Sequence, residues 1–195
     1  MFTFTLFLSL WARILLLMVT PRESASLPAP VSNAVTSSSE SSIKEQVIWS
    51  TTRRLSWDDF KGQPDDTNPH HALTAANLAV NAKCKDNSYT YVVNCVFLPS
   101  ESWSKNKASE KLLVHEQLHF DLTEVHARQL RRDLQKLSCT SVKTSLNSVV
   151  SLAFSKWKAE QDAFDSACKH GLNKEEEKIW AAAIDTRLQE LEAYQ

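Results

Sequence analysis

The pattern of apolar side chains changes near Pro99, and this change constrains the fold more than any other feature of the sequence. Before it, apolar and polar residues alternate in two stretches on either side of a polar turn at 85–88, which predicts a β-hairpin. After it, apolar residues recur at helical spacing, which predicts three helices over 107–137, 142–167 and 174–193. We therefore expect an α+β fold, with a small antiparallel β-sheet followed by a long helix and two further helices.

A short histidine motif lies inside the first of these predicted helices. Residues 115–119 read His-Glu-Gln-Leu-His. Four helical residues turn through about 400°, so His115 and His119 project from one face about 6 Å apart. Two imidazoles so placed suit one tetrahedral Zn²⁺ ion, and Glu116 is placed to act as general base on a zinc-activated water. The pattern predicts a zincin-like domain, and its alternative is a surface helix that carries these residues by chance.

A catalytic zinc ion needs a third protein ligand and one open position. If the first two helices form an antiparallel hairpin that turns near 139–140, residues 115–119 face 160–164, and the far end of the second helix lies just beyond. The third ligand is therefore expected there. The candidates are His170, preferred because it stands beside a helix-terminating glycine, then Asp165, Glu160 and Glu124.

Other polar residues could support such a site. Asp121 and Glu124 are candidates to hold the metal-bound imidazoles by hydrogen bonds, although Glu124 and Arg128 also have the spacing of a helical ion pair. His126 is expected at the surface or behind the ligands. The loop pair His70–His71 could reach the site as a proton donor or oxyanion stabiliser, or could simply be exposed.

The N-terminus predicts export. An apolar run from Phe2 to Val19 precedes small residues near Ala25, so residues 1–25 are interpreted as a signal peptide and 26–44 as a Ser/Pro-rich linker. A membrane anchor is the alternative, and the charge of Arg13 within the run speaks against it. The folded unit is expected to be a single domain over residues 45–195. We expect the protein to be secreted, or periplasmic if it is bacterial.

Four cysteines lie within the folded part, and an exported chain is expected to pair them as two disulfides. In the predicted hairpin Cys95 lies opposite Leu78, about 20 Å from Cys84, which is too far for a bridge. Cys139 and Cys168 lie at opposite ends of the second helix. If the first helix runs back along the preceding strand, the bridges are Cys84–Cys139 and Cys95–Cys168.

The composition limits the classes of molecule that the protein is expected to bind. The formal net charge is −1 and the chain has only two glycines, so neither nucleic acid nor a glycine-rich nucleotide loop is indicated. We expect a peptide or protein substrate, no membrane contact once the signal peptide is removed, and a monomer. The substrate is expected between the hairpin edge and the first helix, as an added strand.

Several stretches together resemble domain-of-unknown-function family 922, a family of predicted secreted zinc-dependent proteases. They are 55–62 (LSWDDFKG), Ser102–Trp103, 115–128 and 164–171. The last stretch departs from the family pattern, with Phe164 for the usual Tyr and Cys168 for the usual Thr. The resemblance implies a zinc-binding hydrolase domain in which the motif positions are His115, Glu116, His119, Asp165 and His170.

Two hypotheses of different classes follow. The first is a secreted zinc metallopeptidase that holds the metal through His115, His119 and His170, with Asp165 as the alternative third ligand. The second is a secreted, zinc-stabilised and disulfide-bonded binding or effector module without turnover. Glu116 distinguishes them, because a structural zinc site does not need a general base.

Overall fold

The β-hairpin forms where the alternating pattern predicts it. Strand β4 (Ala76–Lys85) pairs antiparallel with β5 (Ser88–Phe97) along their whole length. The two turn residues, Asp86 and Asn87, have φ angles of 51° and 60°. Consecutive positive φ angles are those of a tight hairpin turn whose twist matches the strands, and Asp and Asn tolerate them better than most residues.

The structure, a computed structural model, describes residues 4–6 and 45–195. The predicted signal peptide and linker therefore lie outside the described residues, except for Phe4–Leu6, which forms strand β1 against β4. On the other side of the hairpin, β2 (Val47–Ile48) pairs with β5. A separate two-stranded sheet joins β3 (Ala72–Leu73) to β6 (Trp103–Ser104). All described residues belong to one compact unit.

Three helices follow the strands, as predicted: α1 (Glu110–Leu134), α2 (Val142–Cys168) and α3 (Lys174–Glu190). Two of them begin at side chains that accept a hydrogen bond from a first-turn amide, Ser109 for α1 and Asn173 for α3. Short 3₁₀ turns complete the described elements: η1 (Trp57–Asp59), η2 (Pro99–Glu101) and η3 (Glu192–Tyr194). The described part of the chain is thus α+β, with a small antiparallel sheet and three helices.

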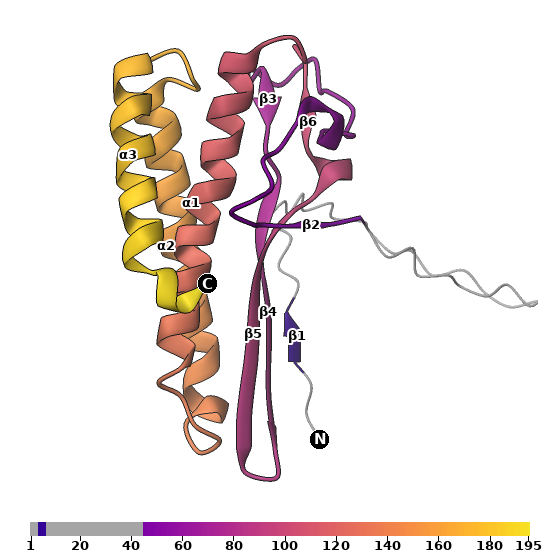
Figure 1. Ribbon diagram of the computed structural model, residues 1–195. Helices are drawn as coiled ribbons and strands as arrows, with labels where there is room; N and C mark the ends of the chain where they lie inside the picture. Colours follow the sequence, from indigo (N-terminus) through magenta and orange to yellow (C-terminus); the bar gives the residue numbers. More distant parts are fainter. Residues whose placement is uncertain (1–3, 7–44) are drawn as a thin grey trace, which may run out of the picture. The chain divides into compact units, whose positions relative to one another are not determined.

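Helix α1 is the centre of this arrangement, between the hairpin and the pair α2 and α3 (Figure 1). One buried cluster joins α1 to the hairpin and to the first half of α2, and it includes Leu78, Cys95, Phe97, Phe120, Leu130 and Val150. A second cluster joins α1 to the end of α2 and to α3, with Leu118, Leu122, Val125, Phe164, Cys168 and Ile184. Because α1 packs on both sides, most of its side chains are buried, including the polar ones around the histidine motif.

One predicted disulfide is confirmed and the other is wrong. Cys84, near the hairpin tip, is bridged to Cys139 in the α1–α2 connection, with a Cα–Cα distance of 5.6 Å. Cys95 lies opposite Leu78 as predicted, but it is a free buried thiol, as is Cys168. The two belong to different buried clusters, Cys95 to the one that includes the hairpin and Cys168 to the one that includes α3.

Among the described residues, no helix is long and apolar enough to cross a bilayer.

Candidate metal centre

The two motif histidines lie on the face of α1 that packs against α2. Their side chains are 2% and 14% exposed for His115 and His119, respectively. Both rings pack against Phe164 of α2, with centroid distances of 4.7 and 4.8 Å. The predicted register of the helix hairpin is confirmed, because Gln161 of α2 meets His119. A buried apolar wall therefore holds both rings in place.

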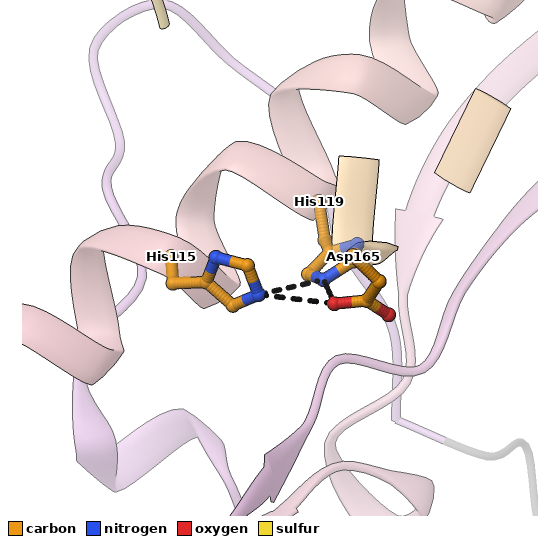
Figure 2. A group of neighbouring side chains, drawn as sticks. All are labelled: His115, His119 and Asp165. Carbon is orange, nitrogen blue, oxygen red and sulfur yellow. Dashed lines mark hydrogen bonds and ion pairs between the residues drawn. The ribbon is translucent and has the colours of Figure 1, made fainter. Parts of the chain in front are cut away.

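Three ligand-type atoms converge between these helices (Figure 2). The Nε2 atoms of His115 and His119 are 3.3 Å apart, and Asp165 Oδ1 lies 3.1 and 3.2 Å from them. A tetrahedral zinc with bonds of about 2.0–2.1 Å places its ligand atoms about 3.3 Å from one another. The residues present therefore fit a metal ion, and this group of two histidines and an aspartate could hold one.

The charges at this point also favour a cation. Burial raises the pKa of Asp165, but hydrogen bonds from His115 and His119 outweigh it and hold the pKa well below its usual range. Burial lowers the pKa of His119, yet the hydrogen bond to Asp165 and the nearby charge of Glu116 raise it overall. A metal ion at this point would bind unprotonated imidazole nitrogens and would therefore compete with protons for them.

Two further residues complete the surroundings of the histidines, and the sequence indicated neither. Gln161 Oε1 of α2 lies 2.6 Å from His119 Nδ1, and Glu177 Oε2 of α3 lies 3.2 Å from His115 Nδ1. Gln161 falls in the stretch predicted to face the motif, so register marks its position. Glu177 stands among three consecutive glutamates, and no local pattern singles it out.

The connection between α2 and α3 determines how α3 approaches the site. Lys169, His170 and Gly171 have φ angles of 48°, 52° and 81°, a left-handed run that reverses the chain. A Cβ atom on Gly171 would lie 3.2 Å from His115 Cγ. Glycine is therefore required here both by the backbone conformation and by the close approach to the His115 ring.

His170, the preferred third ligand on sequence grounds, stands at the edge of the group. Its Nδ1 atom is 3.1 Å from the same Asp165 Oδ1, and its side chain is 52% exposed. The three-residue group contains Asp165, the predicted alternative, and not His170. His70 packs edge-on against His170 with a centroid distance of 4.5 Å, so the loop before β3 does reach the rim of the site.

Glu116 is buried between the helix and the segment after β3. The residue is 3% exposed, and its carboxylate has no hydrogen-bond partner among the described residues. Thr74 donates to the Glu116 carbonyl at 3.2 Å. The carboxylate is close enough to His119 to affect its pKa.

Comparison with known proteins bears on the family. The model of the family described as "Bacterial protein of unknown function (DUF922)" matches residues 39–171. The chain belongs to this family. No curated protein and no solved structure matches the chain.

In this member of DUF922 the LSWDDFKG stretch supports the motif helix from behind. The Leu55 amide donates to Gln117 Oε1 at 2.7 Å, and Lys107 Nζ donates to the Phe60 carbonyl at 2.6 Å. Gly62 lies against Ser102, where its amide donates to the Ser102 carbonyl at 2.8 Å and a Cβ would clash with that oxygen. These residues hold the N-terminal part of α1, and none of them is among the ligand-type residues of the site.

Two predicted supports of the imidazoles are wrong. Asp121 accepts hydrogen bonds from Trp49, Arg54 and Gln117, and Glu124 is paired with Arg128, as its spacing also indicated, and with Arg131. None of these partners is His115 or His119. Helical spacing alone did not reveal which carboxylate shares a face with the histidines once the helix is packed on two sides.

His126 and Glu160 form a contact that is separate from the group of His115, His119 and Asp165. Glu160, a candidate third ligand, is bound to His126 Nε2 at 2.7 Å and to Arg187 of α3. Burial raises the pKa of Glu160, but these hydrogen bonds and charges outweigh it and lower the pKa to about 2. His126 is buried, not at the surface, at 4% exposure.

Proposed function

We propose that this DUF922 protein is a secreted zinc-dependent metallopeptidase with a zincin-like site. The observation that carries the proposal is the convergence of the two Nε2 atoms and Asp165 Oδ1 at tetrahedral spacing, directly beside the buried and unpartnered Glu116. Two histidines with a carboxylate are one of the ligand sets of catalytic zinc sites, which leave a fourth position open.

Zinc held there would supply Lewis acidity, lowering the pKa of a coordinated water towards 7 and polarising a scissile carbonyl. His115, His119 and Asp165 hold the metal in this proposal. Glu116 accepts the proton of the attacking water and returns it to the leaving amine. His70 and His170, which meet at the rim, are placed to donate a hydrogen bond to the developing oxyanion.

The substrate position in this proposal differs from the sequence-based expectation. The space between the hairpin and α1 is occupied by the buried cluster. By contrast, the segment that leaves β3 touches α1 at Glu116 through Thr74. An extended peptide is better placed alongside the β3–β6 sheet, where main-chain hydrogen bonds would align it with the metal group.

The test is a comparison of Glu116→Gln with Glu110→Gln. Glu110 is exposed in the first turn of the same helix, so the control has the same change of charge. Glu116→Gln is expected to keep one zinc per chain and to lose peptide hydrolysis by about 1000-fold or more, whereas Glu110→Gln retains both. Activity that survives Glu116→Gln would refute the peptidase proposal.

The second candidate is a zinc-stabilised, disulfide-bonded module without turnover. One observation favours it: His170 Nδ1 reaches the ligand carboxylate, and a rotation of this ring towards the metal would give four protein ligands, the closed set of a structural site. Cobalt substitution distinguishes the two. Absorption that changes when a small anion such as azide is added indicates an open position and supports the peptidase, and unresponsive spectra support the module.

A further inference from the structure

We infer that Gln161 and Glu177 act together as positioning residues that fix the tautomers of the two histidine ligands, so that α3 is an essential part of the metal site. The inference rests on the metal binding in the proposed function and not on peptide hydrolysis. The family match ends at Gly171, so Glu177 lies outside the matched stretch.

The need for such residues follows from imidazole chemistry. A neutral histidine carries its proton on either Nδ1 or Nε2, and it can ligate a metal only through the nitrogen without the proton. The Nε2 atoms of His115 and His119 are the ones that converge with Asp165. Both rings must therefore be protonated at Nδ1 in order to bind a metal ion.

At His119 the hydrogen-bond network allows only one orientation of the Gln161 side-chain amide. Thr123 Oγ1 donates to the His119 carbonyl at 2.8 Å and accepts from Trp157 Nε1 at 3.1 Å and from Gln161 Nε2 at 3.0 Å. Gln161 Nε2 also donates to the His119 carbonyl at 3.0 Å. A flipped amide would place its oxygen against that carbonyl oxygen. The amide oxygen of Gln161 must therefore face His119 Nδ1, which has to be the donor.

At His115 a carboxylate has the same effect. Glu177 is 6% exposed, and its Oε1 accepts a hydrogen bond from Lys174 Nζ at 2.8 Å. Its Oε2 lies 3.2 Å from His115 Nδ1. An ionised carboxylate can only accept, so Nδ1 carries the proton. A carboxylate on this side also increases the basicity of the opposite nitrogen as a metal ligand.

The loop before α3 delivers Glu177 to this point. The left-handed run Lys169–Gly171 is held by backbone hydrogen bonds from His170 to Asp165 at 3.1 Å and from Asn173 to Cys168 at 2.8 Å. A Cβ atom on Gly171 would lie 3.2 Å from His115 Cγ, so only a glycine lets the turn pass this close to the ring. The same turn thus follows the ligand Asp165 and, one helical turn into α3, places the carboxylate that orients His115.

The experiment is a measurement of zinc affinity, by competition with a chromophoric chelator, on the folded chain and three variants. We expect a loss of about 100-fold in Glu177→Leu and about 10-fold in Glu177→Gln, which keeps an acceptor without the charge. Gln161→Met is expected to lose about 10-fold. The matched control is Glu175→Gln, an exposed glutamate on the same helix whose partner is Lys178, and it should change less than about 2-fold.

Two further measurements separate positioning from general destabilisation. Thermal melting of the metal-free variants identifies any that are unfolded, and Gln161→Met, on a different helix, tests the same idea independently. In zinc-loaded wild-type protein, NMR should show slowly exchanging Nδ1–H protons of His115 and His119, besides any N–H signal of the buried His126, and Glu177→Leu should lose the one from His115.

The outcomes are distinct. A graded loss from Glu177→Gln to Glu177→Leu with a silent control supports the inference. Zinc binding by the wild type that all three folded variants retain within about 2-fold overturns this inference and leaves the proposed function intact. A wild-type chain that binds no zinc overturns both.

Discussion

Two histidines of helix α1, the buried His126 and the half-buried His119, each contact a carboxylate of α2, but the two carboxylates have different other partners. His126 Nε2 lies 2.7 Å from Glu160, whose other partner is the guanidinium of Arg187. His119 Nε2 lies 3.2 Å from Asp165, whose other partners among the described residues are the imidazoles of His115 and His170. The same residue type on the same helix thus occupies two electrostatically different sites.

The difference shows why burial of a histidine does not by itself indicate a metal ligand. At Glu160 a permanent cation balances the carboxylate, so nothing is gained from a metal ion. At Asp165 the partners among the described residues are imidazoles, which can bind either a proton or a divalent metal ion. A site suited to a metal is therefore recognised by a carboxylate and imidazoles that converge without a guanidinium or ammonium group.

The largest expected effect tests this contrast directly. His119→Ala should weaken zinc binding on the order of 1000-fold because it removes a ligand. His126→Ala should bind zinc within about 3-fold of wild type and should lower the free energy of unfolding of the metal-free protein by about 2 kcal/mol, through the lost hydrogen bond and packing. Metal analysis measures the zinc binding, and chemical denaturation measures the free energy of unfolding. Loss of zinc in His126→Ala would erase the distinction between the two sites.

The next effect sharpens the ligand assignment within the metal site. Asp165→Ala is expected to weaken zinc binding by about 100-fold or more, whereas His170→Ala should cost about 10-fold or less, because His170 reaches the group only through Asp165. Titration of each metal-free variant with zinc gives the affinities. The reverse order would make His170 the third ligand, as its place beside Gly171 predicts, and Asp165 its support.

The smallest effect concerns the stability of the His126 site at acidic pH. The pKa of Glu160 is lowered from 4.5 to about 2, so its contribution to stability is fully present above pH 4.5 and is lost as the pH falls from about 4.5 to about 2. Because this side chain is 26% exposed and solvent screens its charge, we expect the charge to contribute about 1 kcal/mol to the free energy of unfolding.

Denaturation of wild type and Glu160→Gln at several pH values tests this window. The difference in unfolding free energy should be about 1 kcal/mol at pH 6 and should approach zero below about pH 2. The control, Asp162→Asn, removes an exposed carboxylate paired with Lys158 and should show a flat difference. A difference between wild type and Glu160→Gln that does not change with pH would mean that Glu160 contributes through packing and not through its charge.

Much of the fold was predictable because it depends on local periodicity. Alternation predicted the hairpin and its register, and helical spacing predicted three helices whose ends lie close to those observed. Simple antiparallel register also predicted the Cys84–Cys139 bridge. These features follow from the rise per residue of strands and helices, which any segment of the right pattern shares.

The candidate site was predictable only in part. The spacing of the motif put His115 and His119 on one face, and register brought the right part of α2 to them. It did not distinguish Asp165 from Glu160, since the two lie little more than one helical turn apart and both face α1. Arg187 of α3 made that distinction, because it neutralises Glu160 and leaves Asp165 to the histidines.

The sequence by itself thus determined the α+β order, the pair of histidines with the adjacent Glu116, and the membership of the family, because these are encoded in residues close together along the chain. Only the tertiary structure decided that Asp165 joins the group, that Gln161 and Glu177 orient its rings, and that Cys95 and Cys168 stay apart. The reason is that these contacts depend on the packing of α1 on two sides and on the left-handed turn at Lys169–Gly171. Neither the two-sided packing nor the left-handed turn produces a repeating pattern in the sequence.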